Sequence, residues 1–107
     1  MDDITRHLPL APRDLLILAV LAEGPLHGYG IIKAVEARAF QGVHLDPANL
    51  YRVLRRMRAL GWLAEEEDGG ERRRTHVITP AGRAVLRAEL GRLEALLAQA
   101  RPAVTGS

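Results

Sequence analysis

The sequence has no cysteine, few aromatic residues and no long apolar segment. Without cysteine, neither disulfides nor thiolate metal sites can form. The longest apolar run, from Leu15 to Ala22, is too short to span a bilayer. Asp2 and Asp3 occupy positions where a signal peptide would carry basic residues. We therefore expect a cytoplasmic protein that has no membrane partner.

The usual signatures of catalysis are also missing. The sequence shows no Ser-His-Asp arrangement, no catalytic pair of carboxylates and no glycine-rich phosphate loop. Four histidines have spacings that match no common set of metal ligands. They are His7, His27, His44 and His76. We therefore expect a protein that is not an enzyme and that uses no metal or cofactor.

The residues that are present favour one small helical domain. The chain has 107 residues, of which 48% are hydrophobic, and alanine and leucine dominate. The formal net charge is +2, although the isoelectric point is near 9.7. Because so small a net charge says little about partners, the placement of the arginines is more informative.

Capping residues, prolines and apolar periodicity predict the order helix, helix, helix, hairpin, helix. An arm or short extra turn is expected at 1–11, a very short strand at 43–45 and a frayed tail at 102–107. The main predicted elements are helices at 12–22, 28–39, 47–60 and 80–100 and strands at 62–67 and 72–78, the strands being joined by the turn Asp68-Gly69-Gly70. The fold class is therefore mainly α with a small β-hairpin.

The predicted helix 47–60 carries four arginines and no acidic residue. Arginine can bond guanine edges or phosphates, and asparagine can bond adenine, so this face suits a DNA groove. The alternative is an ordinary solvated basic face. The start of such a helix usually contacts bases and its later turns contact the backbone. The candidate base contacts are Asn49, Tyr51 and Arg52, and the candidate phosphate contacts are Arg55 and Arg56.

Three arginines follow the predicted hairpin turn, and they are Arg72, Arg73 and Arg74. Arginines beside a flexible tip can reach along a phosphate backbone. The alternative is pairing across the hairpin with Glu65, Glu66 and Glu67, and we expect some arginines to pair and those nearest the tip to stay free. A helix-turn-helix followed by a basic hairpin is the winged-helix arrangement. Residues 1–79 would then form the arm and the winged-helix DNA-binding domain.

The last predicted helix carries leucines at alternating spacings of four and three, a pattern typical of a coiled-coil seam. This stripe either packs on its own domain or forms a dimer interface. The helix at 12–22 favours a partner subunit, because it is apolar on nearly every side and so small a domain can hardly enclose it. We therefore predict a homodimer in which 80–107 form the dimerisation helix and tail. The predicted interface residues are Leu15, Leu18, Leu86, Leu90, Leu93 and Leu97.

Four segments, in matching order, resemble the PadR family of bacterial regulators. The run Leu26-His27-Gly28-Tyr29-Gly30-Ile31-Ile32 is similar to the family's HGY-x-I signature, and Asp46 to Met57 resembles its P-x-x-LY-x-x-L-x-R stretch. Gly61-Trp62-Leu63 and Thr79-Pro80-Ala81-Gly82-Arg83 are similar to its G-L-I and T-x-x-G-R segments. The resemblance covers about Arg13 to Leu97. It implies a winged-helix repressor of the short subtype, with a single C-terminal helix that dimerises.

The resemblance also implies further contacts and an effector. Tyr29 would approach the DNA backbone, although packing of its ring is an equal alternative, and Lys33 on the outer face of the same helix is another candidate contact. A small-molecule effector of unknown identity would release the repressor. His76 stands where the family usually has tyrosine, and 80–100 contain no aromatic residue. The drug binding known for some short relatives is therefore not carried over.

Together these patterns predict a sequence-specific DNA-binding regulator, a repressor that acts as a homodimer on a palindromic operator in double-stranded DNA. The alternative is a winged-helix module for protein–protein interaction, in which the basic surface would bind an acidic partner. The regulator would bind DNA at physiological salt, whereas the interaction module would bind it only weakly under the same conditions.

Overall fold

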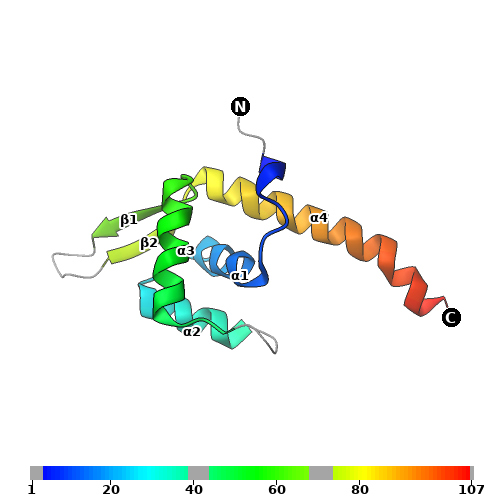
Figure 1. Cartoon of the computed structure of the whole chain (residues 1–107), viewed down its shortest axis with the longest axis horizontal. Helices are drawn as coiled ribbons and strands as arrows, with labels where there is room; N and C mark the ends of the chain where they lie inside the picture. Colours follow the sequence, from blue (N-terminus) through cyan, green and yellow to red (C-terminus); the bar gives the residue numbers. More distant parts are fainter. Residues whose placement is uncertain (1–3, 39–43, 68–73, 107) are drawn as a thin grey trace.

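The computed structural model describes residues 4–38, 44–67 and 74–106, and the fold has the predicted order of elements. The elements are η1 (Ile4–His7), α1 (Pro12–Ala22), α2 (Gly28–Arg38), α3 (Pro47–Ala59), β1 (Leu63–Glu67), β2 (Arg74–Ile78) and α4 (Pro80–Thr105). Figure 1 shows α1, α2 and α3 gathered beside the hairpin, with α4 crossing the body and extending beyond it. The expected mainly α fold with one hairpin and a long last helix is confirmed.

Two helices begin at the same kind of capped proline. The side chain of Asp46 accepts a hydrogen bond from the Asn49 backbone N–H, and Thr79 does the same for Gly82. Each cap is followed by a proline, whose missing N–H costs nothing in the first turn of a helix. These local signals explain why the starts of α3 and α4 were predictable from the sequence.

The hairpin is a regular antiparallel pair that is tied to the rest of the domain. Its register runs from Leu63 opposite Ile78 to Glu67 opposite Arg74. A further bridge joins Leu26 to His76 through two backbone hydrogen bonds of 2.9 and 3.2 Å. This bridge, which the sequence analysis missed, fixes the segment before α2 against the hairpin. The very short strand predicted at 43–45 is not formed by His44 and Leu45, and Val43 lies outside the described residues.

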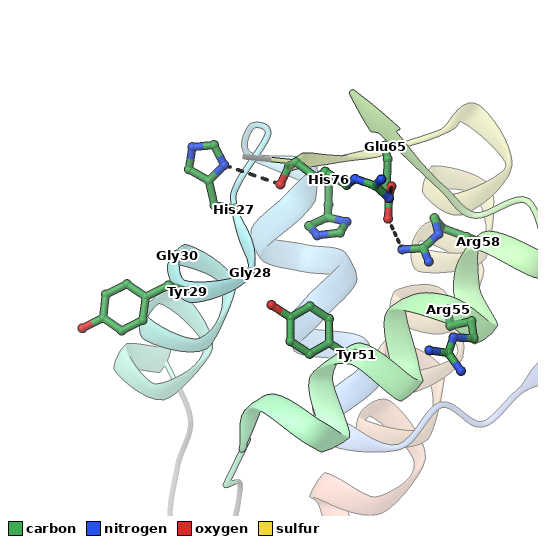
Figure 2. A pocket seen from close by; sticks show the side chains of 10 residues that line it. His27, Gly28, Tyr29, Gly30, Tyr51, Arg55, Arg58, Glu65 and His76 are labelled. Carbon is green, nitrogen blue, oxygen red and sulfur yellow. Dashed lines mark hydrogen bonds and ion pairs between the residues drawn. The ribbon is translucent and has the colours of Figure 1, made fainter. Parts of the chain in front are cut away.

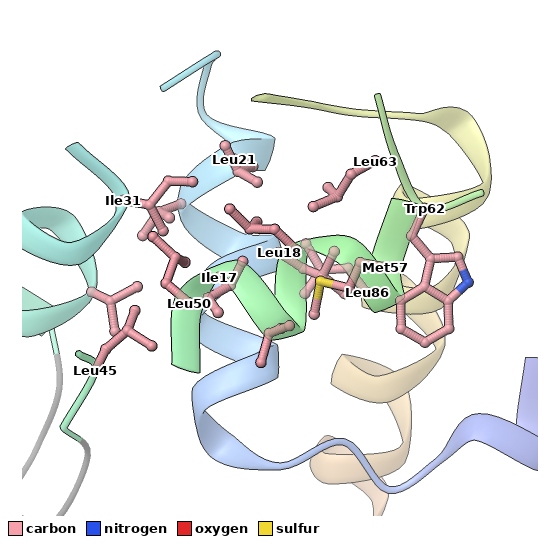
Figure 3. Close-up of a cluster of buried hydrophobic side chains, with 14 of the residues drawn as sticks. Ile17, Leu18, Leu21, Ile31, Leu45, Leu50, Met57, Trp62, Leu63 and Leu86 are labelled. Atoms are coloured by element: carbon pink, nitrogen blue, oxygen red, sulfur yellow. The ribbon is translucent and has the colours of Figure 1, made fainter. Parts of the chain in front are cut away.

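The core is centred on α1, which is enclosed by α2, α3, α4 and the hairpin (Figure 3). Ile17 and Leu18 are completely buried within this one chain. The inference that α1 needs a partner subunit to cover it is therefore wrong. Leu18 has no surface left for a partner and drops out of the predicted interface, whereas Leu15 stays partly exposed. The sequence could not show that four other elements surround one short helix.

Helix α4 is longer than predicted and leaves the body of the domain. It continues through Pro102 to Thr105, so the prediction of a frayed tail from 102 is wrong. A proline removes one N–H and tends to kink a helix rather than always ending it. Every residue from 94 to 106 is exposed. The radius of gyration is 15.4 Å, against about 13 Å for a compact chain of this size, which reflects the projecting helix.

The first turns of α4 are held against the body at two points. At Gly82, an added Cβ would lie 2.3 Å from the carbonyl oxygen of Trp62, so only glycine permits this close approach. Further along, the buried carboxylate of Glu89 accepts a 2.7 Å hydrogen bond from the Leu10 backbone N–H and pairs with Arg92. That hydrogen bonding from Arg92 lowers the pKa of Glu89 below its ordinary value. In the described part of the chain, no helix is long and apolar enough to cross a membrane.

Candidate nucleic-acid interface

A groove of about 780 Å³ lies between the start of α2, the outer face of α3 and the hairpin (Figure 2). Its wall is mainly basic and aromatic, and it brings together four of the predicted contacts. These are Tyr29, Tyr51, Arg55 and Arg74. Gly28 and Gly30 line the same groove on either side of Tyr29, so the first turn of α2 presents backbone there as well as the tyrosine ring.

Both tyrosines project into solvent at the mouth of the groove. Tyr29 is 71% exposed and Tyr51 is 58% exposed, which is unusual for such large rings. The ammonium of Lys33 lies 5.6 Å from the centre of the Tyr29 ring, a cation–π contact. Tyr29 is therefore not packed in the core, which was the alternative left open by the sequence.

The arginines of α3 differ sharply in their partners. Arg56 is paired with Asp14 of α1, whose side chain is only 6% exposed. Arg58 is paired with Glu65 of β1 at 2.5 Å. Within the part of the chain that the structure describes, Arg55 is exposed and has no ion pair or hydrogen bond from its side chain.

Asn49 and Arg52 form a short chain of hydrogen bonds at the start of α3. The amide nitrogen of Asn49 donates to Asp46 at 2.9 Å, and its amide oxygen accepts from the guanidinium of Arg52. The amide of Asn49 is therefore already engaged at both ends. Arg52 itself stays exposed, and its orientation is set by Asn49.

Arg74 also meets Glu65, at 3.0 Å, so one carboxylate binds an arginine from α3 and another from β2. This is the pairing across the hairpin that the sequence left as an alternative. Arg72 and Arg73, the other two predicted hairpin contacts, lie outside the described residues. Glu66 and Glu67 are exposed, and no ion pair joins them to another described residue.

His76 closes the inner end of the groove. His76 is only 4% exposed, and its Nδ1 has no hydrogen-bond partner among the described residues. Burial lowers the pKa of His76 below 6.5, an effect that nearby Glu65 opposes and that Arg58 reinforces. Burial therefore favours the neutral form of the imidazole.

The sequence analysis did not identify Asp14 as the partner of an arginine on α3. Asp14 lies on a face of α1 that becomes buried, and an acid on an apolar face is a signal for a buried ion pair. Glu65 carried no such signal, because it is one of three consecutive glutamates. Only the register of the hairpin selects it, since Glu65 and Glu66 point to opposite faces.

A helix-turn-helix formed by α2 and α3, followed by a hairpin with a basic groove between them, defines a winged-helix protein of the DNA-binding class. Residues 17–88 match the transcriptional regulator PadR-like family. The chain belongs to this family, whose members are transcriptional regulators rather than enzymes, as the sequence resemblance predicted. Within the described residues a single helix follows the wing, as in the short subtype.

Individual relatives support the same placement. A crystal structure of a PadR family transcriptional regulator from Eggerthella lenta is 27% identical, with a TM-score of 0.67, covering 87% of this chain and 84% of that one. The structure of Bordetella bronchiseptica BpsR, whose DNA binding is regulated by 6-hydroxynicotinic acid, shares the fold at 22% identity and a TM-score of 0.70, covering 90% and 66%.

A relative known from sequence is an uncharacterized 37.1 kDa protein in transposon TN4556 of Streptomyces fradiae. It is 43% identical over 75 residues, or 70% of this chain and 21% of that protein. The chain thus spans about a fifth of the length of this curated relative.

Proposed function

We propose that this regulator is a repressor that binds a palindromic operator as a homodimer, with α3 in the major groove and the hairpin along the backbone. The observation that carries the proposal is the pair of exposed arginines on α3, Arg52 and Arg55, beside a groove open toward the hairpin. They are three residues apart and so share one helical face. That face has the width and charge that a major groove accepts.

Within this proposal, the first turns of α3 contact base edges. Arg52 is exposed and held by Asn49, and Tyr51 is exposed one position earlier. A guanidinium with a fixed orientation discriminates bases better than a freely rotating one, because less entropy is lost on binding. We assign base contacts to Arg52 and Tyr51, and to Asn49 the positioning of Arg52.

Phosphate contacts are proposed around the groove. The guanidinium of Arg55 has no partner in the described part of the chain, and Tyr29 and Lys33 extend the surface along α2. Arg72 and Arg73 would follow the backbone from the hairpin. Arg74 is left out of this set, because it is paired with Glu65. Arg56 is not included among the phosphate contacts. If it left Asp14 to bind a phosphate, the buried carboxylate of Asp14 would lose this ion pair.

The homodimer is proposed on the exposed leucines of α4. Leu90 is 44% exposed and Leu97 is 53% exposed, on the part of the helix that leaves the body. Leu93, half-buried, lies on the same face, and Leu86 marks where the face enters the core. Burying such a stripe against a second copy removes apolar surface from water. Two copies would present two α3 helices to half-sites about one turn of DNA apart.

A small-molecule effector is part of the proposal, by analogy with the family and with BpsR. A thermal-shift screen of small aromatic acids and metabolites tests it, followed by release of bound DNA as the second readout. A compound that raises the melting temperature without releasing DNA would count against an effector role.

The function is tested with DNA from upstream of the protein's own gene. Fluorescence anisotropy should show tight, saturable binding at physiological salt to one segment, and footprinting should show a protected palindrome. Reporter expression from that promoter should fall when the protein is present. Weak binding to every segment at physiological salt, together with capture of an acidic protein, would favour the interaction module instead.

A further inference from the structure

Glu65 is the only carboxylate among the described residues that line the basic groove. Its two oxygens bind different arginines, Arg58 of α3 at 2.5 Å and Arg74 of β2 at 3.0 Å. The Glu65 side chain is 23% exposed, so it is neither a core residue nor a freely solvated one. Figure 2 shows it next to Arg58, joined to it by a dashed line.

A carboxylate at this position opposes phosphate binding in two ways. It repels the phosphate directly, and it occupies two guanidinium groups that would otherwise neutralise phosphates. Ion pairs that are partly exposed contribute only about 0–1 kcal/mol to stability. Its effect on the surface charge of the groove is therefore the larger consequence of its presence.

We propose that Glu65 limits sequence-independent DNA binding by holding Arg58 and Arg74 away from phosphates. Random DNA is bound almost entirely through phosphates, so every arginine that is withheld lowers that binding. Arg55, in the same groove, has no such partner among the residues that the structure describes, so it stays available. Weak random binding leaves more of the repressor free for its operator, because competing random sites vastly outnumber operators. This inference rests on the proposed DNA-binding role of the groove.

The decisive variant is Glu65→Gln, which keeps the shape of the side chain and removes its charge. Affinity for a random duplex should rise about threefold to tenfold, because up to two arginines per subunit become available. The slope of log affinity against log salt should steepen by about one to two units per subunit. A residue that only stabilised the hairpin would give the opposite result, a loss of affinity.

Glu66→Gln is the matched control. It makes the same change in net charge on the same strand, but Glu66 is exposed and lies on the other face of the hairpin. It should change random binding less than twofold. An equal gain in Glu66→Gln, or no gain in Glu65→Gln, would overturn the proposal.

A second comparison avoids altering Glu65 and so does not depend on the folding of that variant. Arg58→Ala should weaken random binding less than twofold, because Arg58 is held by Glu65. Arg55→Ala should weaken it severalfold, because Arg55 has no ion-pair partner among the described residues. Equal losses would show that Glu65 does not withhold Arg58. If the wild-type chain binds no DNA at all, the proposed function fails; if it binds DNA and these differences are absent, only the inference about Glu65 fails.

Discussion

Arg56 of α3 forms an ion pair with Asp14 of α1, and the arginine is 54% exposed while the acid is almost completely buried. Asp14 also accepts a 3.2 Å hydrogen bond from Arg13. A buried carboxylate that loses a partner is costly, because its desolvation is no longer compensated. The pair therefore joins α3 to the core, and we expect it to keep Arg56 from binding phosphate.

Replacing Arg56 should consequently affect stability more than DNA binding. We expect Arg56→Gln to lower the free energy of unfolding by about 1–3 kcal/mol, as for an unsatisfied buried charged acceptor. Urea titration measures this loss, and Asp14→Asn in the same background should recover part of it. A stable variant with uniformly weaker DNA binding would instead assign Arg56 to phosphates, as the sequence had suggested.

Arg52 and Arg55 should separate base contacts from phosphate contacts. Arg52→Ala is expected to cost about 1–3 kcal/mol on the operator and little on scrambled DNA. Arg55→Ala should weaken both and flatten the salt slope by about one unit per subunit. Anisotropy on both duplexes at one fixed salt concentration gives the comparison. The assignment of Arg52 is wrong if the ratio of its two affinities matches that of the wild type.

Two charged substitutions on α4 test the dimer. Leu90→Lys combined with Leu97→Lys should give monomers by light scattering and abolish operator binding, because one half-site alone binds weakly. The matched control is Ala95→Lys with Gln99→Lys, which adds the same charge on the opposite side of α4. Both control positions are exposed. A dimer that survives the leucine substitutions would exclude this stripe as the interface.

Stability should depend on pH through His76. Burial lowers its pKa below the ordinary 6.5, so at acidic pH the unfolded chain takes up a proton more readily than the folded one. The free energy of unfolding therefore keeps its full value above about pH 6.5, as far as His76 is concerned, and decreases as the pH falls below that value. His76→Phe should reduce this decrease in urea titrations between about pH 7 and pH 5. An unaltered pH profile in His76→Phe would refute the assignment.

Two glycines of α4 should respond to alanine in opposite directions. Gly82→Ala should destabilise the fold by about 1–3 kcal/mol, because the new Cβ would collide with the carbonyl of Trp62. An added Cβ at Gly91 meets nothing within 4 Å, so Gly91→Ala should stabilise the helix by about 1 kcal/mol. Thermal unfolding of the two variants decides the matter. A destabilised Gly91→Ala dimer would indicate that the two copies of α4 approach closely at this glycine.

The local features of this protein follow from its sequence. Asp46-Pro47 and Thr79-Pro80 start helices because capping and a fixed proline φ act within one turn. The apolar face of α3 and the hairpin are set by periodicity and turn residues, which are also short-range. This is why the order of elements, the winged-helix arrangement and the family could be predicted without coordinates.

Only the tertiary structure decided which arginines of α3 are paired with an acid and which are left to bind a partner molecule. Arg55, Arg56 and Arg58 are chemically identical in the sequence, but packing places Asp14 beside Arg56 and Glu65 beside Arg58. The same holds for Leu18, which is apolar like its neighbours in the sequence. Other elements of the same chain enclose it, so it cannot belong to the predicted dimer interface. Ion pairs and burial depend on residues far apart in the chain, so local patterns cannot specify them.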